Sequence, residues 1–219
     1  MSFAKRTGDP VDALLADYAA GSLQGPMSVL VEAHLELSPQ NLSFVRDLDV
    51  LGGILLDDAP PMPLKDRDSR LAAILADDAP PPPVRRRPPE VADPVLPTAI
   101  RRFIGRPFSE VRWHSKLPGL KECRLDRDGT EVSLMWLRAG SAVPAHTHTG
   151  REAVLVLSGG FSDAYGRYDR GDLAVADEMT DHKPVADDDE DCICFIVQEG
   201  HLKLTGLLGR IFQRLIERR

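Results

Sequence analysis

A proline-rich stretch in the middle of the chain limits what the sequence can fold into more than any other feature does. It runs over residues 77–97 as DDAPPPPVRRRPPEVADPVLP and combines a proline tract, an arginine cluster and almost no apolar periodicity. Such a segment favours an extended, polyproline-like conformation and is poorly suited to a packed core. The sequence therefore predicts two folded parts with separate cores, joined by a linker over residues 77–97.

The part before the linker, residues 1–76, carries the signals of short helices. Asp9 and Ser38 are each followed by a proline at the first helical position, which is typical of a helix N-terminus. Gly21 and Gly52 follow apolar stripes and predict helix ends. Each helix has one apolar face, so we expect a small bundle that needs a partner surface to cover it fully. The expected helices occupy residues 9–21, 25–37, 38–52 and 69–76.

The part after the linker changes to short β-type segments. EAVLVLSG, GDLAVAD and DCICFIVQEG follow one another with glycine and aspartate turns between them, and an Asp-Gly turn stands at Asp128 and Gly129. Strands at this spacing predict a sandwich or barrel over residues 98–200. Residues 201–219 return to a helical period, which predicts an amphipathic C-terminal helix. We expect its apolar face to pack on the barrel or on a second copy of the chain, which would make a homodimer.

Composition excludes several classes of protein. The hydrophobic fraction of 42% in 219 residues suffices for ordinary cores, and no apolar run reaches the roughly 18 residues of a membrane span. The N-terminus lacks the pattern of a signal peptide, so we expect a soluble cytoplasmic protein that does not bind membranes. A net charge of −7 argues against direct binding of nucleic acid. We expect the thiols of Cys123, Cys192 and Cys194 to be reduced.

Four residues after the linker form a candidate metal site. His146 and His148 are two apart, so in a strand their side chains point to the same face, and Glu152 keeps the same parity. His182 lies on a later segment that closure of a barrel could bring beside them. Such a set suits zinc, iron, manganese, nickel or copper and does not choose among them. Histidines in a polar surface loop are the alternative, but that explanation suits a lone histidine better than this cluster.

The spacing of these residues resembles the motifs of the cupin family. Gly140, His146, His148, Glu152 and Gly159 stand at the defining positions of the first cupin motif. The second motif is half present, because Gly171 and His182 have the expected separation while Asp177, Met179 and Ala186 replace its proline, glycine and asparagine. These replacements concern the turn more than the ligands. The resemblance implies a cupin β-barrel that binds one divalent transition metal, with zinc as first choice over iron, manganese and nickel, through His146, His148, Glu152 and His182.

The first half of the chain resembles ChrR-type anti-sigma factors, in which a helical domain is fused to a cupin. The resemblance is carried by LLADYAAGSL and LVEAHLELSPQN, and at the C-terminus by KLTGLLGRIFQRLI. It implies an α+β multidomain protein: a helical anti-sigma domain over residues 1–76, a cupin over 98–200 and a final helix. It also implies a partner, an extracytoplasmic-function (ECF) sigma factor that the helices keep from RNA polymerase.

One motif of that family is altered in this chain. Zinc-binding anti-sigma domains have the pattern His-x-x-x-Cys-x-x-Cys, and here His34 is followed by Ser38 and Asn41 at the cysteine positions. A serine and an asparagine cannot supply the two thiolates that hold structural zinc. We therefore predict no zinc in the N-terminal domain, and expect His34 to lie on the helix surface or face a partner.

The resemblance favours a regulator over an enzyme. As a regulator in a stress response, the chain would sequester its sigma factor and sense a signal, such as an oxidant, through the cupin metal. The alternative is a metal-dependent cupin enzyme, dioxygenase-like or isomerase-like, with a degenerate helical appendage. A third alternative is a metal-binding cupin protein that has lost its anti-sigma function.

Overall fold

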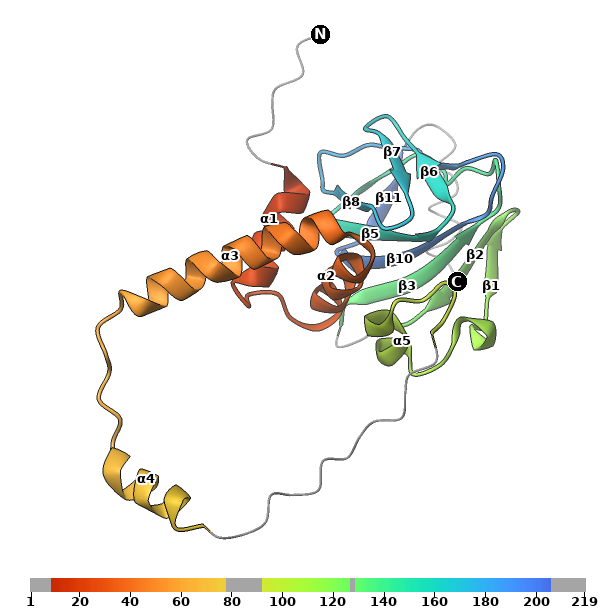
Figure 1. The fold of residues 1–219 in the computed structure, drawn as a ribbon. Coiled ribbons are helices and arrows are strands. Elements are labelled where there is room, and N and C mark those ends of the chain that lie inside the picture. The colour runs from red at the N-terminus through yellow and green to blue at the C-terminus, as the bar shows by residue number, and fades with distance from the viewer. Residues whose placement is uncertain (1–8, 78–91, 127–128, 206–219) are drawn as a thin grey trace.

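The computed structural model describes residues 9–77, 92–126 and 129–205, and helices precede strands in it as expected (Figure 1). The N-terminal helices include one whose N-cap was predicted correctly, since the Asp9 side chain accepts a hydrogen bond from Val11 N at 2.9 Å. The fifth helix follows the proline-rich stretch and precedes a short 3-10 turn, Phe108–Glu110. The helices are α1 (Pro10–Ala19), α2 (Gly25–Leu37), α3 (Pro39–Asp57), α4 (Arg67–Leu75) and α5 (Thr98–Ile104).

The strands form a β-barrel of the expected class. A six-stranded antiparallel sheet has the order β1-β2-β3-β10-β5-β8, a smaller sheet has the order β7-β6-β9, and β11 pairs with β4. The strands are β1 (His114–Leu117), β2 (Leu120–Arg124), β3 (Glu131–Leu137), β4 (His146–His148), β5 (Arg151–Ser158), β6 (Gly160–Ser162), β7 (Arg167–Asp169), β8 (Leu173–Ala176), β9 (Val185–Ala186), β10 (Cys192–Glu199) and β11 (Leu202–Leu204).

The central strands β5 and β10 are apolar on both faces. Leu155 and Phe195 belong to one buried cluster together with residues of α1, α2 and α5. Val154 and Cys194, one position earlier on each strand, belong to a second cluster inside the barrel. Side chains alternate between the faces of a strand, so each strand contributes to two cores at once. The unbroken apolar runs in the sequence are explained by this double burial.

The prediction of two separate cores is wrong. Figure 1 shows α1 and α2 beside the sheet, and α2 contacts α5, β5 and β10 while α1 contacts β8. Leu14, Leu15, Leu30 and Val31 are at most 1% exposed and lie in the same buried cluster as the outer face of the sheet. A sheet with two apolar faces needs cover on the second face, and the N-terminal helices provide that cover.

Three boundaries also differ from the predictions. Residues 78–91 of the expected linker lie outside the described residues, but Leu96 near its end is 3% exposed and belongs to the core. Helix α3 continues through Gly52 and Gly53 to Asp57. The helix expected over residues 201–219 is wrong for Leu202–Leu204, which form β11, and its remainder from residue 206 lies outside the described residues.

Helices α3 and α4 leave a large apolar area uncovered. Figure 1 shows the end of α3 pointing away from the barrel and α4 standing apart from it. None of the side chains of α4 is buried. Among the described residues, no helix is both long and apolar enough to cross a bilayer.

Candidate metal centre

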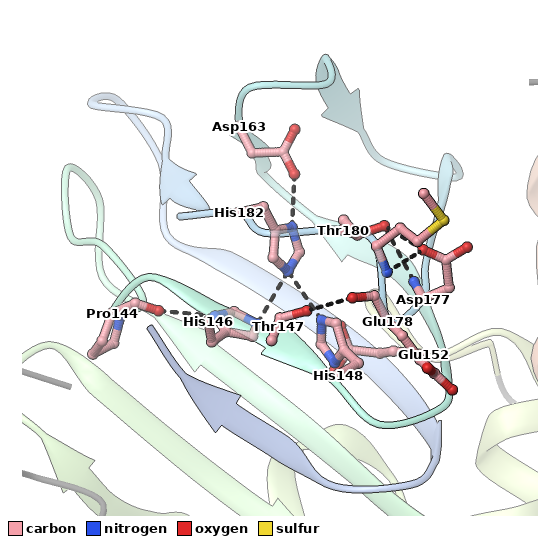
Figure 2. A network of polar contacts seen from close by, with 11 residues as sticks. Pro144, His146, Thr147, His148, Glu152, Asp163, Asp177, Glu178, Thr180 and His182 are labelled. Atoms are coloured by element: carbon pink, nitrogen blue, oxygen red, sulfur yellow. Dashed lines mark hydrogen bonds and ion pairs between the residues drawn. The ribbon is translucent and has the colours of Figure 1, made fainter. Parts of the chain in front are cut away.

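The structure brings the four predicted ligand residues together inside the barrel (Figure 2). His146 and His148 lie on β4 and Glu152 lies on β5, while His182 stands in the loop before β9 and forms a β-bridge with His146. One ligand atom from each residue lies within 4.8 Å of every other, and all four residues are buried. A site of three imidazoles and one carboxylate, of the type expected, could therefore hold a metal ion.

The loop that carries His182 is built without the proline and glycine of the cupin motif. The carboxylate of Asp177 accepts hydrogen bonds from Met179 N and from the Thr180 hydroxyl, each at 3.0 Å. The Thr147 hydroxyl donates to Glu178 O at 3.1 Å, which ties this loop to β4 (Figure 2). The altered motif thus still delivers His182 to the cluster, because an Asp-based turn supplies local hydrogen bonds.

A glycine of the first motif is required by close packing. Gly159 has φ +63°, and a Cβ built there would lie 2.5 Å from Asp191 O. Only glycine tolerates both the conformation and the contact. The turn after β5 can therefore pass directly beside the start of β10.

Two of the histidines are held in one tautomer by partners outside the cluster. His146 Nδ1 donates to Pro144 O at 2.8 Å, and His182 Nδ1 donates to Asp163 Oδ2 at 2.8 Å (Figure 2). A carbonyl or carboxylate oxygen can only accept, so in the neutral ring Nε2 carries a lone pair in both residues. Sequence reasoning missed Asp163, because nothing in GFSDAYG indicates that it faces a histidine nineteen residues later in the chain.

The three imidazole rings are arranged as ligands of a cation would be. His182 Nε2 lies 3.0 Å from His146 Nε2 and 3.3 Å from His148 Nε2, and His148 Nε2 lies 3.6 Å from Glu152 Oε2. In the neutral tautomers the His146 and His182 lone pairs face each other across 3.0 Å without a proton between them. A metal ion would use these lone pairs and the carboxylate as ligands and would supply a positive charge or Lewis acidity there.

Burial favours the neutral form of the ligand side chains, which is the metal-binding form of histidine but not of glutamate. Burial lowers the pKa of His146 and of His148 to about 4, so both rings are neutral at pH 7. Burial raises the pKa of Glu152 to about 7. Without a cation, a charged carboxylate is costly at this position, and a bound divalent ion would compensate that cost.

A small apolar cavity adjoins the ligands. It has a volume of about 60 Å³ and is lined by the ligands His146, Glu152 and His182, by apolar side chains, and by Cys192 and Cys194. The two thiols are buried, and their sulfur atoms lie 3.5 Å apart. The cysteines therefore face the barrel interior, one of the two orientations that their spacing allows.

The expectation that His34 lies on a helix surface or faces a partner is wrong. Its side chain is 2% exposed and hydrogen-bonds to Gly171 of the barrel and to Asn41 of α3. The sequence signal for this contact was absent, because Gly171 is 137 positions away.

Comparisons with known proteins agree with this architecture. A family described as the ChrR Cupin-like domain matches residues 103–203. The chain is 35% identical to the Anti-sigma-E factor ChrR of Cereibacter sphaeroides over 92% of this chain and 94% of that protein. Its structure resembles ChrR in the crystal structure of Rhodobacter sphaeroides SigE in complex with the anti-sigma ChrR. The TM-score there is 0.69 with 32% identity, over 86% of this chain and 96% of the other.

Proposed function

The chain belongs to the family of ChrR-type anti-sigma factors, and on this premise we propose that its helices sequester an ECF sigma factor in the cytoplasm. Binding would cover the surfaces through which the sigma factor contacts RNA polymerase. The metal centre in the barrel would receive the signal that changes the affinity of the helices for the sigma factor.

The observation that carries the proposal is an exposed apolar surface on one part of the molecule. Of the fifteen exposed large apolar side chains among the described residues, eleven lie between Phe44 and Leu75. Exposed apolar side chains gathered in one segment of a chain mark a contact with another protein. We call it the α3–α4 surface, and it consists of Phe44, Val50, Leu51, Ile54, Leu55, Leu56, Met62, Leu64, Leu71, Ile74 and Leu75.

The sheet offers a physical link between the metal centre and the helices. Glu152 lies on the inner face of β5, and the neighbouring residues Ala153 and Leu155 lie in the cluster that α1 and α2 share. A shift of β5 at the ligand would therefore move side chains against the helices. A signal at the metal centre can release the sigma factor only if the protein binds the sigma factor with different affinity in the two states of the centre.

We propose an oxidant as the signal and zinc as the resident metal. A set of three imidazoles and one carboxylate accommodates zinc, although iron, manganese and nickel accept the same ligands. The Cys192 and Cys194 thiols line the same cavity as the ligands, so an oxidant that enters it meets both. The cavity of about 60 Å³ is far smaller than the roughly 300 Å³ at the lower end of substrate pockets, so on this side of the centre it admits a molecule of the size of a small oxidant.

The test is co-purification of the full chain with individual sigma factors of its host, followed by affinity measurements on variants. Ile54→Asp and Leu55→Asp place a charge in the α3–α4 surface, and each should weaken binding by about 10- to 100-fold. Met179→Asp is the matched control, because Met179 is an exposed apolar residue on the barrel. Equal affinity of all three variants for the sigma factor would refute the proposed surface.

A further inference from the structure

The residues at the altered zinc motif form a hydrogen-bonded chain that ends on the barrel. His34 Nδ1 donates to Gly171 O at 2.7 Å, and Asn41 Nδ2 donates to His34 Nε2 at 2.8 Å. Gly171 O can only accept, so Nδ1 carries the proton and Nε2 carries the lone pair that Asn41 occupies. Both ring nitrogens are thus used within the protein.

These residues do not fit a zinc ion. Ser38 ends α2 and precedes α3, its backbone N–H donates to His34 O at 2.8 Å, and its hydroxyl makes no capping hydrogen bond. A neutral hydroxyl and a neutral amide are poor substitutes for two thiolates. The one remaining candidate, His34 Nε2, already accepts a hydrogen bond from Asn41.

The chain of hydrogen bonds reaches a turn that is itself fixed to the sheet. Gly171 lies between β7 and β8, and its N–H donates to Val156 O on β5 at 2.9 Å. It has φ +95°, and a Cβ built there would lie 3.2 Å from the Cβ of Leu37. A glycine at this position lets the end of α2 approach the turn closely.

A second contact holds the same end of α2 to the barrel side. The Glu36 carboxylate accepts hydrogen bonds from Thr98 N at 2.7 Å and from Ala99 N at 2.8 Å. These amides open α5, so Glu36 supplies the cap that the N-terminus of α5 needs. His34 and Glu36 therefore connect α2 to two different elements of the C-terminal part.

We propose that the Asn41–His34–Gly171 chain is a metal-independent anchor, which replaces a zinc site and fixes the corner between α2 and α3 on the barrel. The anchor sets the direction in which α3 leaves the barrel, because Asn41 lies in the first turn of α3. It does not depend on which partner the α3–α4 surface binds.

The surroundings of His34 favour the neutral ring that the anchor requires. Burial lowers the pKa of His34, while the hydrogen bond to Gly171 and the negative charge of Asp172 act in the opposite direction. A protonated ring would turn an Nε2–H towards Asn41, and the present contact with the amide nitrogen would have to be replaced by one with the amide oxygen.

The first experiment measures metal content in the full chain. Wild type and His34→Ala, each loaded with zinc and dialysed, should hold the same number of zinc ions per chain. A loss of one zinc ion per chain in His34→Ala would show that His34 is a ligand and would overturn the anchor.

The second experiment measures amide hydrogen exchange in the same two proteins. Loss of the anchor should accelerate exchange about ten-fold, both at residues 34–41 and at residues 168–173. Residues 131–137 of β3 should exchange as in wild type, and His201→Ala, which truncates an exposed histidine, should change neither segment. Unchanged protection at residues 168–173 in His34→Ala would contradict the proposal.

A milder variant keeps the test decisive if His34→Ala does not fold. In Asn41→Asp the carboxylate can only accept, so His34 must carry protons on both nitrogens to keep the contact. The pKa of His34, followed by NMR, should rise by about one unit or more. An unchanged pKa would show that residue 41 does not contact the ring, and the anchor would be rejected.

Discussion

The candidate metal ligand His182 is held in place by a residue outside the ligand set. Its Nδ1 is bonded to Asp163, whose side chain is 3% exposed. The other oxygen of Asp163 accepts hydrogen bonds from Tyr165 N and Gly166 N, so the carboxylate is fixed by its own turn. A carboxylate held in this way orients the imidazole and makes its other nitrogen a stronger donor to a metal.

We predict that Asp163→Asn weakens metal binding by roughly 10- to 100-fold, because the amide keeps the shape of the side chain but removes its negative charge. Competition with a chelator of known affinity measures the effect. Asp189→Asn is the matched control, since Asp189 is an exposed residue between β9 and β10. Equal metal affinity in the two variants would show that Asp163 does not support His182.

Metal binding should release a proton in a manner that depends on pH. Glu152 has a pKa of about 7 in the metal-free site, while the His146 and His148 rings, with pKa values of about 4, are already neutral. At pH 7 Glu152 is partly protonated, so a metal must displace a proton, and at pH 8.5 Glu152 is largely ionised. Calorimetry in buffers of different ionisation enthalpy should therefore find more proton released on metal binding at pH 7 than at pH 8.5. Equal release at both pH values would contradict this assignment.

The ligand cluster could be predicted from the sequence because most of its residues lie close together in the chain. His146, His148 and Glu152 share one parity over seven positions, and His182 stands at a recognisable distance. Asp163 and Asn41 could not be recognised, because their roles arise from contacts made by folding. Aspartate in a turn and asparagine in the first turn of a helix each have an ordinary local explanation.

At the scale of elements, local sequence rules predicted where a helix begins better than where it ends. Asp9 begins α1 as expected, because an N-cap side chain acts within a few residues. Gly52 does not end α3, because one glycine costs a helix only about 1 kcal/mol and leaves its hydrogen bonds possible. β11 was missed because LKL is too short to show a period, and its pairing with β4 lies more than fifty residues back in the chain.

The two glycines inside α3 lead to a prediction about helix stability. A Cβ built at Gly52 or Gly53 meets no atom within 4 Å, and neither residue has a positive φ. Gly52→Ala and Gly53→Ala should each stabilise the second half of α3 by about 0.5–1 kcal/mol. Amide exchange at residues 50–57 should slow accordingly, while exchange in β10 stays unchanged. Gly159→Ala serves as the contrast and should destabilise the barrel, because its Cβ would meet Asp191 O at 2.5 Å.

At the scale of the whole molecule, the proline-rich stretch suggested that the helices and the barrel form separate cores, but the two parts pack against each other. A linker of this composition can separate two domains, but it does not prevent them from docking. Ala153, Leu155 and Leu157 of β5 and the buried faces of α1 and α2 belong to one apolar cluster. Separating the helices from the barrel would expose that cluster to water, and the free energy of this exposure opposes independent unfolding.

The shared cluster predicts that helices and barrel unfold together. Far-ultraviolet circular dichroism reports mainly on the helices, whereas tryptophan fluorescence reports on the barrel side, where Trp113 and Trp136 pack against the cluster. The two signals should give the same midpoint in a thermal or denaturant titration of the full chain.

His146→Ala combined with His148→Ala extends this prediction to the metal site. Loss of bound metal removes stabilisation from the folded state, so both midpoints should fall, and they should fall by the same amount. Helix α4 is the exception, because none of its side chains is buried and its contribution should melt earlier. A helical transition that keeps its wild-type midpoint while the fluorescence transition falls would mean that the helices fold independently of the barrel. In that case the docking contacts of α2 would be too weak to carry a signal from the metal centre to the α3–α4 surface.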